Sequence, residues 1–198
     1  MILTAIISLI LGIICGQFFF SDDIIKIFSY IADYALYITM FSVGISVGLN
    51  SSVFSKIRQY HFKILLIPMG IVIGTLIGGA LCSILLNEKL TVSLAITSGM
   101  GWYSLSGVLI TDLVGADAGA IAFLSNLMRE IISFIIIPPI AINLNHYTAI
   151  APAGATSEDT TLPVLIKYAN TEIVIVAVIN GVVCSALVPL LINMFLTL

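Results

Sequence analysis

Residues 64–86 read ILLIPMGIVIGTLIGGALCSILL, a run that contains no Asp, Glu, Lys or Arg. A helix needs roughly 20 apolar residues to cross the ~30 Å hydrocarbon core of a bilayer, and this run is long enough by itself. Comparable apolar stretches occupy residues 2–20, 24–48, 118–144 and 173–196. The sequence therefore predicts an all-α integral membrane protein that forms a single transmembrane domain over residues 1–198.

The composition of the whole chain agrees with a location in the lipid bilayer. Hydrophobic residues make up 60% of the 198 residues and charged residues only 9%, and the mean hydropathy is +1.21. Soluble domains average about 25% charged residues, so this chain lacks the charge that would cover a water-soluble surface. The net charge is −3, and the sequence has no block of basic residues that could bind the phosphates of a nucleic acid. The composition argues against a soluble enzyme, a disordered chain and a nucleic-acid binder.

The motifs of enzymes and metal sites do not fit this chain. Residues 44–48 have the form Gly-x-Ser-x-Gly, but they end a predicted helix instead of joining a strand to a helix. The histidines, His61 and His146, fall in predicted loops, and the three cysteines are far apart. We expect no enzymatic activity, no cofactor and no metal site. Gly70, Gly74 and Gly78 form a ridge that is typical of close helix packing.

Two further apolar segments, residues 90–113 and 149–169, are interrupted by Gly-, Ser- and Thr-rich breaks. We expect both to cross as discontinuous helices, which gives seven membrane segments; five spans with two re-entrant hairpins are the alternative. Broken helices are tolerated only where protein or a water-filled cavity surrounds them, and paired breaks are typical of secondary transporters. The break residues that we expect to contact substrate are Gly99, Gly101, Trp102, Tyr103, Ser104, Ser106, Gly107, Gly154, Thr156, Ser157, Thr160 and Thr161.

Two charged residues lie mid-way along the predicted span 118–144. Arg129 and Glu130 are neighbours, so they point about 100° apart on a helix and cannot simply neutralise each other. Asn126 lies one turn earlier and can support either side chain. Because charges at membrane depth normally face a partner or an aqueous path, we expect these three residues to bind substrate or protons.

Other acids also lie at membrane depth. Asp33 falls inside the second predicted span, and Glu158 and Asp159 lie at the second break. We expect all three to bind substrate or protons, with an interfacial or capping role for Glu158 and Asp159 as the alternative. The excess of acids over Arg129 favours a cationic cargo, with protons or sodium as the coupling ion.

The lysines and arginines of short loops predict the orientation of the chain. Lys56, Arg58 and Lys63 cluster between the second and third predicted spans, which places that loop in the cytoplasm. Asp22 and Asp23 in the first loop suit the outside. The N-terminus is then cytoplasmic and the C-terminus outside, whether the broken segments cross or turn back.

Three motifs carry a resemblance to a known family. They are GWYSLSG at residues 101–107, NLMRE at 126–130 and GATSEDTTLP at 154–163. In this order and spacing they resemble the LysO-type lysine exporters of bacterial inner membranes. The resemblance implies export of L-lysine and of its toxic analogue thialysine in exchange for protons. It also implies that intramembrane acids are essential, and on matched positions these are Glu130 and Asp33.

One departure from that family bears on partners. Longer members begin with additional membrane helices, and this chain starts after them. We therefore expect a homodimer or a small, separately encoded membrane partner. Two other functions stay open: a sodium- or proton-coupled carrier of another small solute, and a non-transporting subunit that completes a partner's bundle.

Overall fold

The computed structural model describes residues 62–169 and 171–197, and scattered positions between residues 7 and 45. The chain forms two compact units, Met1–Ser42 and Val43–Leu198. In the first unit, residues 14–18 and 24–28 are helical, and the rings of Phe20 and Phe28 stack with their centroids 5.2 Å apart. Asp33 and the loop with Lys56 and Arg58 lie outside the described residues.

The described part of the second unit consists of helices, with no strand among residues 62–197. Its elements are the short 3₁₀ helix η1 (Phe62–Leu65), α4 (Leu66–Leu86), α5 (Leu90–Thr97), α6 (Tyr103–Val114), α7 (Ala116–Asn143), the 3₁₀ helices η2 (Thr148–Ile150) and η3 (Gly154–Glu158), α8 (Leu162–Tyr168) and α9 (Thr171–Thr197).

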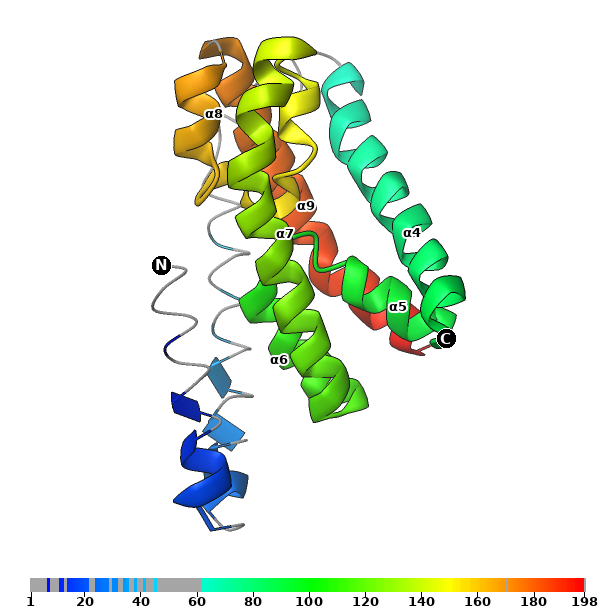
Figure 1. Cartoon of the computed structure of the whole chain (residues 1–198), viewed down its shortest axis with the longest axis vertical. Coiled ribbons are helices and arrows are strands. Elements are labelled where there is room, and N and C mark those ends of the chain that lie inside the picture. Colours follow the sequence, from blue (N-terminus) through cyan, green and yellow to red (C-terminus); the bar gives the residue numbers. More distant parts are fainter. Residues whose placement is uncertain are drawn as a thin grey trace. The chain divides into compact units, whose positions relative to one another are not determined.

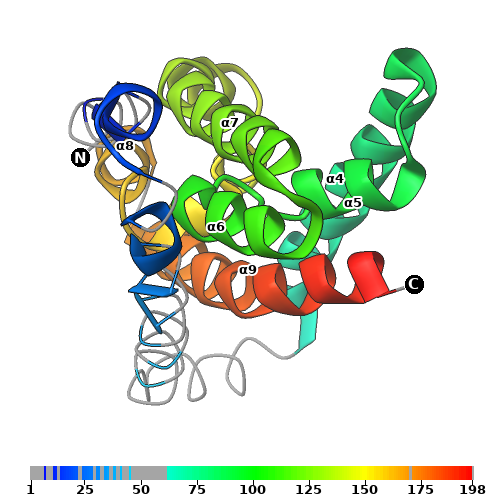
Figure 2. The same ribbon diagram turned by 90° about the horizontal axis from the view of Figure 1, so that it is seen from below.

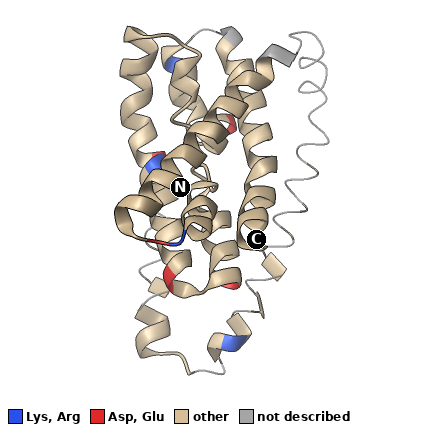
Figure 3. Cartoon of the chain, turned by 90° about the vertical axis from the view of Figure 1, so that its right-hand side faces the viewer, with Lys and Arg blue, Asp and Glu red and all other residues tan. Residues whose placement is uncertain are grey.

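Three of these helices are long and apolar enough to cross a membrane: Leu66–Leu86, Ala116–Asn143 and Ile173–Thr197. They coincide with three of the predicted spans, and few charged residues interrupt them (Figure 3). Helix α4 ends where Asn87 takes a left-handed conformation with φ 56°, and its backbone N–H donates to the Ser83 carbonyl. Asn tolerates this conformation better than most residues do. The prediction of an all-helical membrane protein is confirmed.

Helices α4 and α7 run antiparallel. The middle of α4 meets the middle of α7 where Arg129 donates to the Thr75 hydroxyl. The first turn of α4, at Leu66, lines the same pocket as Tyr147, which follows the end of α7. Ile173, near the start of α9, lines a pocket with the last turn of α7. Helices α4 and α9 therefore begin at the same side of the unit at which α7 terminates. We call this side the Leu66 end, and the opposite side the Leu86 end.

The α5–α6 segment begins and ends at the Leu86 end. Helix α5 starts four residues after α4 ends and packs back along it, so that Thr97 lies against Gly79. Helix α6 then packs along α7, with Gly107 against Phe123, and ends two residues before α7 begins. Both helices lie in the lower half of Figure 1, and α6 lies between α7 and α9 in Figure 2.

The η2–α8 segment begins and ends at the Leu66 end. It follows α7 and reaches the middle of that helix, where the Pro152 carbonyl accepts a hydrogen bond of 2.7 Å from Ser133. Helix α8 then returns, and Tyr168 at its end lines a pocket with Tyr147 and Ile173. The two segments thus approach the centre of the unit from opposite ends.

Candidate functional site

The tips of the two segments meet beside the middle of α7. The backbone N–H of Ala155 donates to the Met100 carbonyl at 3.0 Å. Gly154 has φ +59°, and a Cβ there would lie 2.5 Å from the Met100 oxygen and 3.0 Å from Arg129 Nη2. Met100 and Gly101 also have positive φ, 47° and 95°. The absence of a side chain at Gly154 allows the two backbones to approach this closely.

Asn126 attaches the first tip to α7. Its Oδ1 accepts a hydrogen bond of 2.8 Å from the Gly101 N–H, and its Nδ2 donates to the carbonyls of Ile96 and Ala122, both at 2.9 Å. Asn126 therefore satisfies backbone groups that the break leaves unpaired. Gly99 packs directly on this amide. The structure gives Asn126 a positioning role and shows no hydrogen bond from its amide to Arg129 or Glu130 in the described part.

Glu130 lies buried beside the two tips, with 1% of its surface exposed. Within the described residues, neither of its carboxylate oxygens has a hydrogen-bond partner. The polar groups around it are Thr160 and Asp159 of the second segment and Tyr103 at the start of α6. The Thr160 hydroxyl is also buried without a hydrogen bond of ordinary geometry. Because leaving buried polar groups unpaired is costly, this cluster has the character of a binding site.

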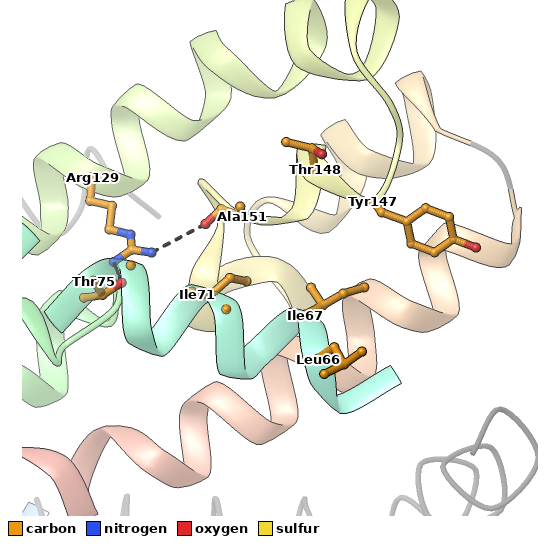
Figure 4. Close-up of a pocket in the computed structure, with 10 residues that line it drawn as sticks. Leu66, Ile67, Ile71, Thr75, Arg129, Tyr147, Thr148 and Ala151 are labelled. Atoms are coloured by element: carbon orange, nitrogen blue, oxygen red, sulfur yellow. Dashed lines mark hydrogen bonds between the residues drawn. The ribbon is translucent and has the colours of Figure 1, made fainter. Parts of the chain in front are cut away.

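Arg129 points to a different side of α7. Its guanidinium donates to the carbonyls of Pro152 at 3.3 Å and Ala151 at 3.5 Å, and to the Thr75 hydroxyl at 3.2 Å (Figure 4). None of these hydrogen bonds within the described residues goes to a carboxylate. Adjacent residues on α7 therefore contact different groups: Arg129 holds the second segment against α4, and Glu130 faces Tyr103 and Thr160.

The two acids of the second break have separate surroundings. Ser185 on α9 donates a hydrogen bond of 2.8 Å to Glu158 Oε1. Gly181 permits this approach, because a Cβ there would lie 2.5 Å from the Glu158 Cβ. Asp159 is exposed, and its Oδ1 accepts a hydrogen bond from the Thr160 N–H. The structure brings Asp159 near Glu130 and attaches Glu158 to α9.

Most hydroxyl groups of the breaks hold the breaks themselves. Ser106 donates to the Trp102 carbonyl at 2.8 Å, Thr156 to Ala153 at 2.9 Å, Ser157 to Ala177 at 2.7 Å and Thr161 to Thr156 at 2.9 Å. Trp102 is half-buried and Ser104 is exposed. Three of these hydrogen bonds stay within their own segment, and that of Ser157 links the second break to α9, so the structure supports a positioning role for these four residues.

Asn180 is a site residue that the sequence analysis missed. It is 1% exposed, and its Nδ2 donates to the Gly154 carbonyl at 2.9 Å and to Ser157 Oγ at 3.0 Å. Asn180 thereby attaches the second tip to α9, as Asn126 attaches the first tip to α7. The available signal was an amide side chain inside an otherwise apolar predicted span.

The long apolar helices, with two interrupted segments that meet beside a buried carboxylate, have the form of a membrane transport protein. The chain belongs to the lysine exporter LysO family, whose family model matches residues 6–196. It is a multi-pass membrane protein of a bacterial inner membrane, and its family is one of transporters and not of enzymes.

Two curated proteins are similar to this chain. The lysine exporter LysO of Escherichia coli (strain K12) is 37% identical over 164 residues, which are 83% of this chain and 54% of that protein. The chain thus spans about half the length of this relative. A putative lysine exporter of Haemophilus influenzae is 38% identical over 170 residues, 82% of each chain. No solved structure matches the chain.

Proposed function

We propose that this chain is a secondary transporter that exports L-lysine, and close analogues such as thialysine, in exchange for protons. Membership of the lysine exporter LysO family supports the cargo. The observation that carries the mechanism is Glu130, a buried carboxylate with no described hydrogen-bond partner beside the meeting point of two interrupted segments. A carboxylate in such a position can hold a proton or pair with an ammonium group, but not both at once.

The α5–α6 and η2–α8 segments form two re-entrant hairpins in this proposal, and the chain has five spans instead of seven membrane segments. The support is that each segment begins and ends at the same end of the unit. A helix rises 1.5 Å per residue, so the eight residues of α5 cover only about 12 Å. That length reaches mid-depth but does not cross a ~30 Å core.

The orientation follows from the loop that precedes α4. Lys56, Arg58 and Lys63 in that loop place the Leu66 end in the cytoplasm by the positive-inside rule. The α5–α6 hairpin then enters from outside and the η2–α8 hairpin from the cytoplasm. The N-terminus is cytoplasmic and the C-terminus is outside, as the sequence analysis expects.

In the proposed transport cycle, substrate and proton exchange at the carboxylate of Glu130. From the cytoplasm, the ammonium group of the substrate displaces the proton of Glu130; from the outside, a proton displaces the substrate. Asp33 is a second acid of this exchange, and a coupled movement of the hairpins exposes Glu130 to one side at a time. Because the two cations compete for one carboxylate, they move in opposite directions.

The test is counterflow of labelled L-lysine in proteoliposomes that contain this chain alone. The proposal expects uptake that requires unlabelled lysine inside, that responds to an imposed pH gradient and that does not depend on sodium. Sodium dependence without pH dependence would show that sodium, and not the proton, is the coupling ion. Uptake of another solute but not of lysine would contradict the cargo. Complete inactivity of the inserted chain would favour the subunit function or a required partner.

A further inference from the structure

A groove lies between α4 and the η2 turn at the Leu66 end. Its volume is about 510 Å³, within the range of ordinary small-molecule sites. Thr75 and Arg129 lie at its inner end, and Tyr147 and Thr148 lie toward its outer end, with Ile71 on the α4 wall between them (Figure 4). A polar inner end and an apolar wall suit a ligand with a charged head and an aliphatic chain.

The groove is open because α4 carries glycines along it. A Cβ at Gly70, Gly74 or Gly78 would meet nothing within 4 Å among the described residues. Gly70 and Gly74 line the groove, whereas Gly78 does not. The ridge that the sequence predicts to be a close-packing surface therefore leaves a hollow in the described part of the chain, and a side chain at Gly74 would project into it.

Arg129 supplies a positive charge that makes no hydrogen bond to a described acid. Its three hydrogen bonds go to neutral oxygens at 3.2–3.5 Å. A guanidinium has five N–H donors, so part of its capacity stays unused by the described chain. Arg129 is half-buried and lines the groove, and a carboxylate is the group that matches the guanidinium fork.

We propose that this groove binds the carboxylate end of the exported amino acid. Arg129 and the Thr75 hydroxyl hold the carboxylate, and the aliphatic chain lies along Ile71. The inference rests on the proposed function and deepens it, because the groove opens at the Leu66 end, which that proposal places in the cytoplasm, where an exporter loads its cargo. It divides recognition into two steps, because Glu130 does not line the groove: Arg129 first selects the carboxylate, and the ammonium meets Glu130 after the substrate has left the groove.

Binding to the detergent-purified full chain tests this division with three probes. L-Lysine carries both groups, 1,5-diaminopentane lacks the carboxylate, and L-norleucine lacks the side-chain ammonium. We expect Arg129→Gln to weaken lysine and norleucine binding about tenfold or more and to leave diaminopentane binding unchanged. Gly74→Leu, which fills the groove without removing a charge, should have the same selective effect. Gly78→Leu on the same ridge is the matched control and should change none of the three affinities.

Two results would overturn the inference. Equal losses for lysine and diaminopentane in Arg129→Gln would make Arg129 a structural link between α4 and the second hairpin. Unchanged lysine binding in Gly74→Leu would place the ligand elsewhere, even if Arg129→Gln does not fold. A third result would separate the inference from the proposed function. If the wild-type chain binds norleucine but not lysine, and both groove variants lose norleucine binding, the groove is supported and lysine is contradicted as the cargo.

Discussion

Neighbouring residues on one helix take different roles at this site because a helix turns about 100° per residue. Arg129 donates to Thr75 and to carbonyls of the second segment, while Glu130 lies among Tyr103, Asp159 and Thr160. The order of the two residues in the sequence already predicts that their side chains diverge. It did not predict which groups each one meets, because those groups come from α4, α6 and the η2–α8 segment.

The first residue-scale prediction concerns Glu130→Gln. Gln keeps the shape and the hydrogen-bonding capacity of Glu, but it neither releases a proton nor pairs with an ammonium. We expect lysine counterflow to fall at least a hundredfold while the protein still folds and inserts, as measured in proteoliposomes and by gel filtration. Glu88→Gln, at an exposed position after α4, is the matched control and should transport normally. A near wild-type rate in Glu130→Gln would make Glu130 a structural residue.

The second residue-scale prediction concerns Gly154→Ala. The added Cβ would meet the Met100 carbonyl oxygen and Arg129 at a position with φ +59°, so the tips must separate. A strained left-handed residue costs of order 1–3 kcal/mol. We expect transport to drop at least tenfold, with a smaller loss of inserted protein on membrane blots. Gly78→Ala, where a Cβ meets nothing within 4 Å, should leave both quantities unchanged; full activity of Gly154→Ala would mean that the tip contact is dispensable.

At the scale of elements, the described chain is interrupted near both predicted breaks, but residues 103–107 of the first predicted break are helical in α6, and the sequence does not predict the path of the chain through either break. The predicted segment 90–113 corresponds to α5 and α6, with a non-helical turn between Thr97 and Tyr103. Apolar length and Gly-rich composition mark such a turn locally. Whether the chain continues across or returns depends on contacts with α4 and α7, which are far away in sequence. The positive charges of the loops did not help, since both paths place Lys167 in the cytoplasm and the C-terminus outside.

Labelling of single cysteines tests the hairpin proposal in a cysteine-free background. Position 88 precedes α5 and position 117 follows α6, so a hairpin places both on one side and a crossing places them on opposite sides. We expect Glu88→Cys and Asp117→Cys both to react with a membrane-impermeant maleimide added outside. Asn145→Cys, at the Leu66 end, should react only after the membrane is opened. If Glu88→Cys reacts with the external maleimide and Asp117→Cys does not, the α5–α6 segment crosses the membrane and the hairpin proposal is wrong.

At the scale of the whole molecule, the proposed exchange joins acids from separate parts of the chain. Asp33 lies in the N-terminal unit, outside the described residues, and Glu130 lies in α7. Two acids that share one exchange site influence each other's proton affinity. The proposed exchange therefore expects a pH dependence that belongs to the pair.

This coupling leads to a prediction for Asp33→Asn. Asn keeps the size of Asp and one acceptor oxygen but removes its charge, so the pH midpoint of lysine counterflow should move and the remaining rate should fall at least tenfold. The measurement is counterflow across a range of equal internal and external pH values, beside wild type and Glu88→Gln. If Asp33 only anchors its helix through hydrogen bonds, Asn will substitute well, and an unchanged midpoint with a good rate would exclude the coupled role.

The sequence alone determined the class of this protein, because the free energy of transferring a side chain from water into hydrocarbon depends on that residue alone and adds up along the chain. It therefore located the spans 64–86, 118–144 and 173–196 within a few residues, and it singled out Glu130 as a costly charge at membrane depth. The family motifs added the cargo as an expectation.

Tertiary structure alone decided how the site is assembled, because its contacts join residues that no local pattern relates. The N–H of Ala155 meets the Met100 carbonyl, Asn180 holds the second tip and Arg129 meets Thr75. Each of these hydrogen bonds satisfies a polar group that cannot bind water in the hydrocarbon core of a bilayer. The packing of the long helices decides which partner lies near enough to form the bond. The same packing leaves Glu130 without a described hydrogen-bond partner, and this makes its carboxylate available for a ligand.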